Sequence, residues 1–151
     1  MAILNDTKYT GRLHIELKDE NGAVKETRDI DNLVVTTGLN WIAGRLYDTS
    51  IPSQISHIAV GTGTTAAAAG DTALGSESHR EALDSTTVST NTVTWVASLE
   101  AGEGTAALTE AGLFNAASGG TMVARVVYDV INKGANDSLS ISWTLTASAS
   151  S

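Results

Sequence analysis

Hydrophobic and polar residues alternate along much of this chain, which is the pattern of β-strands that bury one face. The clearest case is the segment 12–18, in which every second residue is apolar. Because successive side chains of a strand point to opposite faces, Leu13, Ile15 and Leu17 are expected to point inward. The segment therefore predicts a strand at the surface of a hydrophobic core.

The dipeptide Asn21-Gly22 favours a tight hairpin turn after this strand, since both residues tolerate positive φ angles. A return strand is predicted over 23–35. The alanine-rich segment 64–75 is expected to be a long surface loop. The same alternation and turn signals predict further strands over 55–60, 82–90, 92–99, 106–115, 122–131 and 139–146, with a turn at Thr90-Asn91.

One helix is predicted, over 37–47, with Thr36 or Thr37 as its N-terminal cap. Two glycines lower its intrinsic stability by about 1 kcal/mol each relative to alanine. The helix must therefore depend on packing, for which Trp41 is the candidate anchor. The expected packing face carries the apolar residues at helical spacing, which are Leu39, Ile42, Ala43 and Leu46.

About eight strands and one short α-helix predict an all-β, mainly-β fold, either a β-sandwich or a barrel-like single domain. A chain of 151 residues is long enough to bury a substantial core. The β-rich domain is expected over 10–147, between a flexible N-terminal arm over 1–9 and a disordered tail over 148–151. Its largest core anchors are expected to be Trp95, Trp143 and Phe114.

Composition narrows the classes of partner. Asp and Glu outnumber Lys and Arg by 17 to 9, giving a formal charge of −8. This charge repels phosphate backbones and anionic lipids, so neither nucleic acid nor a membrane is expected as a partner. The chain has no cysteine, which excludes disulfides and thiolate metal sites. It also lacks an apolar run of about 18 residues and the features of a signal peptide.

No residue pattern in the chain indicates catalysis or a cofactor. The histidines His14, His57 and His79 have neither the i, i+4 spacing of a helical zinc site nor cysteine partners, so no metal role is expected for them. No Gly-x-Ser-x-Gly motif is present, although a triad assembled from distant segments stays open. Gly61-Thr62-Gly63 lacks the Gly-Lys-Ser/Thr of a phosphate loop and predicts a turn at the end of a strand.

Two acidic stretches are candidates for cation sites. The segment 19–22 begins like a calcium loop but lacks its alternating oxygen ligands, so a hairpin turn explains it. Glu26, Asp29 and Asp31 offer either a weak cation site or a solvated charged face, and the charged face is favoured. The sequence therefore predicts a protein that is not an enzyme, with no catalytic, cofactor-binding or metal-binding residues.

Five segments carry a resemblance: NLVVTTGLNWIA at 32–43, ISHIAVGTGT at 55–64, GDTAL at 70–74, EAGLFN at 110–115 and NKG at 132–134. Together they resemble small virion structural proteins of tailed bacteriophages, and among these most closely the capsid decoration, or cement, proteins. The resemblance spans about residues 10–146. Its motifs mark turns and core positions and include no catalytic residue.

The resemblance implies a noncatalytic β-rich protein on the outer surface of the phage head, made in the cytoplasm of the bacterial host. Its partners would be the major capsid protein, whose neighbouring subunits it would clamp, and further copies of itself in a trimer or dimer. The binding surface is expected to combine the N-terminal arm with the loops at one end of the domain.

The alternative is a tail-fibre, collar or baseplate component, because 55–63 and 110–115 also resemble attachment domains of tail-collar fibres. Against this alternative, the chain carries no repeat of a fibre shaft. A phage hydrolase or a sugar-binding protein also stays open, without support from a motif.

Overall fold

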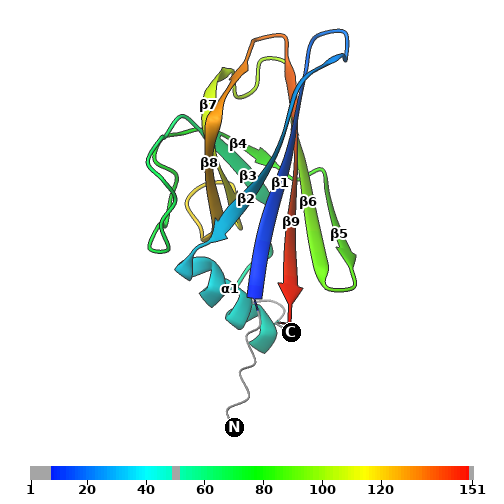
Figure 1. Ribbon diagram of the computed structural model, residues 1–151. Coiled ribbons are helices and arrows are strands. Elements are labelled where there is room, and N and C mark those ends of the chain that lie inside the picture. Colours follow the sequence, from blue (N-terminus) through cyan, green and yellow to red (C-terminus); the bar gives the residue numbers. More distant parts are fainter. Residues whose placement is uncertain (1–7, 49–51, 150–151) are drawn as a thin grey trace.

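The computed structural model describes residues 8–48 and 52–149. Within them, nine antiparallel strands form one sheet that curls into a half-barrel, and one short helix lies at its lower end (Figure 1). The protein is a mainly-β single domain, as the sequence predicts, with one strand more than expected. The elements are β1 (Lys8–Lys18), β2 (Val24–Val34), α1 (Thr36–Tyr47), β3 (His57–Gly61), β4 (Glu77–Ala82), β5 (Ser85–Ser89), β6 (Thr92–Leu99), β7 (Ala106–Phe114), β8 (Met122–Lys133) and β9 (Ser138–Ser148).

The strand order across the sheet is β4-β3-β7-β8-β2-β1-β9-β6-β5. β2 joins the two halves of the sheet, because it pairs with β1 along most of its length but with β8 only at Leu33 and Val34. Beyond these two pairs β2 and β8 separate, and Arg28 of β2 donates to the carbonyls of Asp129 and Val130 on β8. The halves therefore face each other across the core (Figure 1).

The core fills the space between the two halves and contains the predicted anchors. Burial removes large apolar side chains from water, which is the main favourable contribution to folding. The expected inward face of β1 and the three expected aromatic anchors are confirmed. The side chains with at most 4% exposure include Leu13, Ile15, Leu17, Trp95, Phe114 and Trp143.

The strand predicted over 82–90 is confirmed only for β5 (Ser85–Ser89), because the chain leaves the sheet at Leu83 and Asp84, and the preceding strand β4 (Glu77–Ala82) was not predicted. The two residues between these strands connect opposite ends of the sheet. The Leu83 N–H donates to the carbonyl of Ser56 next to β3, whereas the Asp84 N–H donates to the carbonyl of Val96 on β6. Most of β4 is polar, so apolar alternation does not reveal it. The other predicted strands are confirmed: β1 begins four residues before the predicted 12–18, and the ends of the remaining strands differ from the predictions by at most two residues.

The predicted hairpin turn between β1 and β2 is confirmed. Gly22 has φ +81°, a left-handed conformation that glycine adopts without steric cost. The Asp19 carboxylate accepts the N–H groups of Asn21 and Ala23 at 2.9 and 3.0 Å. The acidic segment is thus explained by its role in the turn. The turn between β5 and β6 also lies where the sequence predicts it, and there Thr90 has φ +53°.

Helix α1 forms where expected, but it packs differently. Its N-cap is Val35 without a side-chain cap, so the predicted threonine cap is wrong; the Thr37 hydroxyl instead donates to the carbonyl of Met122. Leu39 and Leu46, expected to be buried, are 46% and 80% exposed. The buried helix residue is Gly38, where the absence of a side chain allows close approach to β8.

Trp41 is partly buried against the core, as expected for an anchor of the helix. Its indole N–H donates to the carbonyl of Ser53 at 2.8 Å, which ties α1 to the segment that follows it. No helix within residues 8–48 and 52–149 combines the length and the apolar character needed to cross a membrane.

The ends of the sheet lie side by side, because Lys8 of β1 pairs with Ser148 of β9 and Tyr9 pairs with Ala147. These two residues of the predicted arm therefore belong to β1, and Ser148 of the predicted tail belongs to β9. The remainder of the arm, 1–7, and of the tail, 150–151, lies outside the described residues.

Candidate functional site

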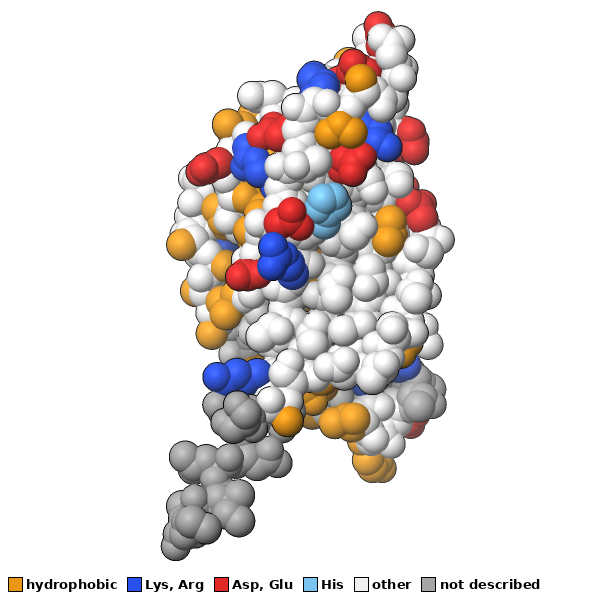
Figure 2. Space-filling model, turned by 45° about the vertical axis from the view of Figure 1, so that its right-hand side comes forward, with side chains coloured by type: hydrophobic (Ala, Val, Ile, Leu, Met, Phe, Trp, Pro, Cys, Tyr) orange, Lys and Arg blue, Asp and Glu red, His pale blue; other side chains and the backbone are white. Residues whose placement is uncertain are grey.

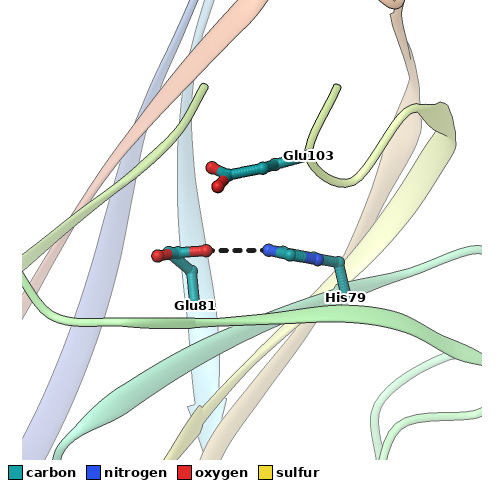
Figure 3. Close-up of side chains that lie close together, drawn as sticks. All are labelled: His79, Glu81 and Glu103. Atoms are coloured by element: carbon teal, nitrogen blue, oxygen red, sulfur yellow. Dashed lines mark hydrogen bonds and ion pairs between the residues drawn. The ribbon is translucent and has the colours of Figure 1, made fainter. Parts of the chain in front are cut away.

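Three titratable side chains converge where β4 meets the turn between β6 and β7 (Figure 3). His79 and Glu81 come from β4, and Glu103 comes from the turn. One nitrogen or oxygen atom of each lies within 4.8 Å of the others, and His79 Nε2 is 2.8 Å from Glu81 Oε2. All three residues are partly buried. One imidazole nitrogen and two carboxylate oxygens are a ligand set that zinc-like divalent ions accept.

Regular backbone structure holds the two ligands from β4. His79 and Glu81 are alternate residues of one strand, so their side chains leave the same face. Both pair with the neighbouring strand β3, His79 with Val60 and Glu81 with Ile58. The edge strand is thus aligned by its partner before any ligand binds.

A tight turn holds Glu103. Its backbone N–H donates to the carbonyl of Glu100, and its carboxylate accepts the Glu100 N–H at 2.8 Å. Gly102 and Gly104 have φ +86° and +57°, which places Glu103 between two left-handed residues. The buried Lys133 Nζ donates to the carbonyls of Glu100 and Asp137 at 2.9 and 2.7 Å. The turn is therefore fixed to the end of β8.

The sequence reveals only part of this cluster. His79 is visible in it as a histidine without a metal-site spacing, and Glu81 follows at the i+2 position of a polar stretch. If this stretch forms a strand, the two side chains lie on one face because they are alternate residues. Glu103 comes from a separate turn, and no local pattern predicts that it lies next to His79.

The other two histidines have different surroundings. His14 lies on the outer face of β1, as expected, but its nitrogens face different carboxylates: Nδ1 is 3.0 Å from Asp29, and Nε2 is 3.7 Å from Glu16. His57 Nδ1 lies 2.7 Å from the Ser56 hydroxyl. No carboxylate bonds to His57 within the described ranges, so the structure does not assemble a Ser-His-Asp triad there.

The three acidic residues of β2 that are candidates for a cation site do not converge. Glu26 points toward the inner side of the strand and pairs with Arg28. Asp29 points outward to His14, and Asp31 is exposed on the same outer face. The segment is therefore a charged strand whose two faces carry separate interactions, and only Asp29 and Asp31 share the exposed face.

A second charged group, formed by Glu110, Arg125 and Asp71, is fully integrated into the fold. Glu110 on β7 is 0% exposed and Arg125 on β8 is 2% exposed, with Arg125 Nη2 2.9 Å from Glu110 Oε2. Arg125 Nη1 lies 2.8 Å from Asp71. Burial would raise the pKa of Glu110, but hydrogen bonds from the Ser76 and Gly75 N–H groups and from Arg125 hold it below its ordinary value.

This buried group fastens the loop that precedes β4. The carboxylate of Glu110 accepts the N–H groups of Gly63, Gly75 and Ser76 at 2.7–2.9 Å. In the predicted turn after β3, the Gly63 N–H therefore donates to the Glu110 carboxylate. The segment 64–75 is a loop, as expected, and Glu110 and Arg125 are the residues that sequence reasoning missed. Their position within an apolar strand segment gave no sign of this role.

Hydrophobic side chains are exposed at the end of the molecule that carries α1. We call this surface the α1 end and define it by Leu39, Leu46 and Tyr47, of which the last two are 80% and 95% exposed. A hollow of about 220 Å³ adjoins it between α1 and the ends of β1, β6 and β9. The hollow is lined chiefly by Tyr9, Trp41, Ile42, Leu46, Trp95 and Leu145.

The outer face of β1, β9 and β6 is polar. Figure 2 shows charged side chains gathered on its upper part, little charge below them, and hydrophobic side chains at the lower end. A shallow hollow of about 610 Å³ on this face includes Thr10, Arg12, His14, Ser142 and Thr144. It offers hydroxyl groups and exposed charges, but not the apolar walls that are typical of small-molecule sites.

Comparison with known proteins does not assign the chain to a family. No protein-family model matches it, and neither a curated protein nor a solved structure matches it significantly.

Proposed function

We propose that this protein is a noncatalytic structural component of a tailed-phage virion. It binds the outer surface of the capsid as a decoration protein and clamps neighbouring major capsid subunits. The identity of the partner rests on the resemblance of the five sequence segments. The observation that carries the binding role is the α1 end, where large apolar side chains are exposed.

The α1 end has the properties of a contact surface. Leu46 and Tyr47 are exposed although each could bury a large apolar area, and an apolar hollow adjoins them. Exposed apolar groups with a hollow beside them are typical of surfaces that bind another protein. A capsid subunit that covered them would gain about 25 cal/mol for each Å² of apolar surface removed from water.

The position of the start of β1 also supports the proposal that the α1 end is the binding surface. β1 begins at Lys8 and pairs there with the last residue of β9, while Tyr9 lines the hollow beside α1. An arm that precedes Lys8 would therefore leave the domain next to the α1 end, within reach of the same partner. An arm that becomes ordered on binding covers a large surface at an entropic cost.

The proposal is tested with phage heads that lack this protein. Purified wild-type protein is expected to co-sediment with such heads, and Leu46→Glu is expected to weaken this binding because it buries a charge against the capsid. Deletion of residues 2–7 should also weaken it. Val24→Glu is the matched control, since Val24 is 53% exposed on the hairpin at the opposite end. Equal binding of wild type and Leu46→Glu would remove the α1 end from the mechanism.

Gold-labelled antibody on intact virions distinguishes the two proposed locations. Label spread over the head at high copy number is the expected result. Label confined to the tail tip or collar would overturn the decoration role and favour the tail-fibre, collar or baseplate alternative. Self-association into a dimer or trimer is proposed as well, and sedimentation equilibrium of the purified protein measures it.

A further inference from the structure

We propose that His79, Glu81 and Glu103 form a binding site for one divalent transition-metal ion of the zinc class. The ion would join the edge strand β4 to the turn between β6 and β7. This proposal does not depend on capsid binding, since it concerns residues away from the α1 end and is measured on the isolated protein.

The geometry requires little movement to reach coordination. Ligand atoms that are each about 2.0–2.2 Å from one ion are at most about 4.4 Å apart. The three ligand atoms already lie within 4.8 Å of one another, and Figure 3 shows the Glu103 carboxylate directed at the space beside the His79–Glu81 contact. Small side-chain rotations therefore bring one nitrogen and two oxygens around a common point.

The charges of the cluster favour a divalent cation. Two carboxylates and a neutral imidazole carry a charge of −2, which one such ion compensates. Within residues 8–48 and 52–149, Glu81 forms no ion pair with Lys or Arg and contacts His79 Nε2 at 2.8 Å, and Glu103 has no ion pair. Lys133 feels the charge of Glu103, but its amino group is engaged with the carbonyls of Glu100 and Asp137.

The ligand types indicate which ion fits. An imidazole nitrogen suits zinc and related transition ions, whereas calcium and magnesium prefer sites made of oxygen alone. The side chains of His79 and Glu81 are 27% and 26% exposed, so water can complete the coordination. Binding exchanges the contact between His79 Nε2 and Glu81 for two bonds to the same ion.

The position of the site gives the ion a structural role. β4 lies at one end of the strand order, and β6 lies next to the other end. An ion held by both β4 and the turn after β6 would fasten the open side of the half-barrel. Because the ion binds the folded chain, it would raise the unfolding temperature, and the rise would increase with the ratio of the free ion concentration to the dissociation constant.

The test is titration of the chelator-treated full-length protein with zinc chloride by isothermal calorimetry. One ion per chain is expected, with a zinc-dependent rise in unfolding temperature. His79→Gln keeps an amide that can donate to Glu81 but removes the imidazole. Glu103→Gln keeps an oxygen that can accept the Glu100 N–H but removes the charge. Each is expected to weaken zinc binding at least about tenfold, by comparison with the effects of residues that only support metal ligands.

His14→Gln is the matched control, because His14 also lies near two carboxylates but presents a different nitrogen to each. It is expected to bind zinc as the wild type does. Equal unfolding temperatures in chelator would show that the variants are folded. Absence of saturable zinc binding, or unchanged binding by His79→Gln, would overturn the site. Calcium bound as tightly as zinc, without an effect of His79→Gln, would also overturn it.

Discussion

Trp95 and Trp143 stand directly opposite each other on β6 and β9, and both are inside the core with 4% and 0% exposure. On the other side of β9, Trp143 stands opposite Leu13 of β1. Its indole N–H donates to Asn32 Oδ1 at 3.1 Å. A row of large side chains thus runs across three neighbouring strands and continues to β2 through a hydrogen bond. Cross-strand pairs of this kind are a main source of sheet stability.

Replacement of Trp143 by alanine is expected to lower the free energy of unfolding by about 3–5 kcal/mol, because it leaves a cavity beside Trp95. Urea unfolding followed by circular dichroism measures the change. Val88→Ala is the control at a position that is 71% exposed, where a change within about 0.5 kcal/mol is expected. A loss below about 1 kcal/mol for Trp143→Ala would contradict its place in the core.

The buried pair of Glu110 and Arg125 is expected to make stability depend on acid pH. The folded chain lowers the pKa of Glu110 below its ordinary value of 4.5, so the native carboxylate binds a proton less readily than the unfolded one. Its contribution is therefore complete above about pH 4.5 and is lost as pH falls through the lower native value. The pKa of Asp71 is lowered too, chiefly by the hydrogen bond from the Ala68 N–H. Asp71 therefore also contributes stability that is lost as the pH falls.

Glu110→Gln tests this dependence by urea unfolding at a series of pH values from neutral to acid. At neutral pH the variant is expected to lose about 3–5 kcal/mol, because Arg125 stays buried without its main partner. Below about pH 4.5 its stability should fall less steeply than that of the wild type. Glu16→Gln, at a partly exposed pair with Lys18, should change stability by less than about 1 kcal/mol. Parallel pH profiles for wild type and Glu110→Gln would contradict the role of Glu110.

Gly38→Ala is expected to destabilise the protein, although alanine is the better helix former by about 1 kcal/mol. A Cβ atom at this position would lie 2.0 Å from the backbone oxygen of Val123, so α1 would have to move away from β8. Overpacking of this kind costs about 1–3 kcal/mol. Gly70→Ala is the control, because nothing lies within 4 Å of its Cβ position. A stabilised Gly38→Ala protein would show that α1 does not pack as described.

Thr90→Gly is expected to stabilise the turn between β5 and β6. Thr90 has φ +53°, and a left-handed conformation costs a β-branched residue about 1–2 kcal/mol. Glycine relieves this strain but adds freedom to the unfolded chain, so a net gain of about 1 kcal/mol is expected. Thermal unfolding measures the gain. Ser89→Gly, at a neighbour without this conformation, should lose stability; an equal loss in Thr90→Gly would contradict the strain.

Sequence patterns predicted those elements whose stability depends on burying one face. β1 was predictable because Leu13, Ile15 and Leu17 alternate with polar residues, and the following turn because Gly22 comes directly after Asn21. The packing of α1 was not predictable in the same way. Its apolar spacing pointed to Leu39 and Leu46, whereas the contact with the sheet depends on the missing side chain of Gly38.

The two polar clusters could not be predicted from sequence patterns, for a different reason. Glu110 occurs in a strand of small and apolar residues, and its partner Arg125 belongs to the next strand. Only the paired register of β7 and β8 brings the two charges together. Likewise, Glu103 approaches His79 only in the folded sheet, where the turn between β6 and β7 meets the edge strand β4. Long-range geometry of this kind leaves no local signature.

The position of β9 in the sheet has a consequence for folding during synthesis on the ribosome. β9 lies between β1 and β6, yet its residues, 138–148, come after those of every other strand in the sequence. While the ribosome is still making them, β1 and β6 each present an open edge, and Trp143 is missing from the core. Open edges can pair with other chains. The sheet therefore closes only after β9 has been made, and until then the nascent chain exposes edges that favour aggregation.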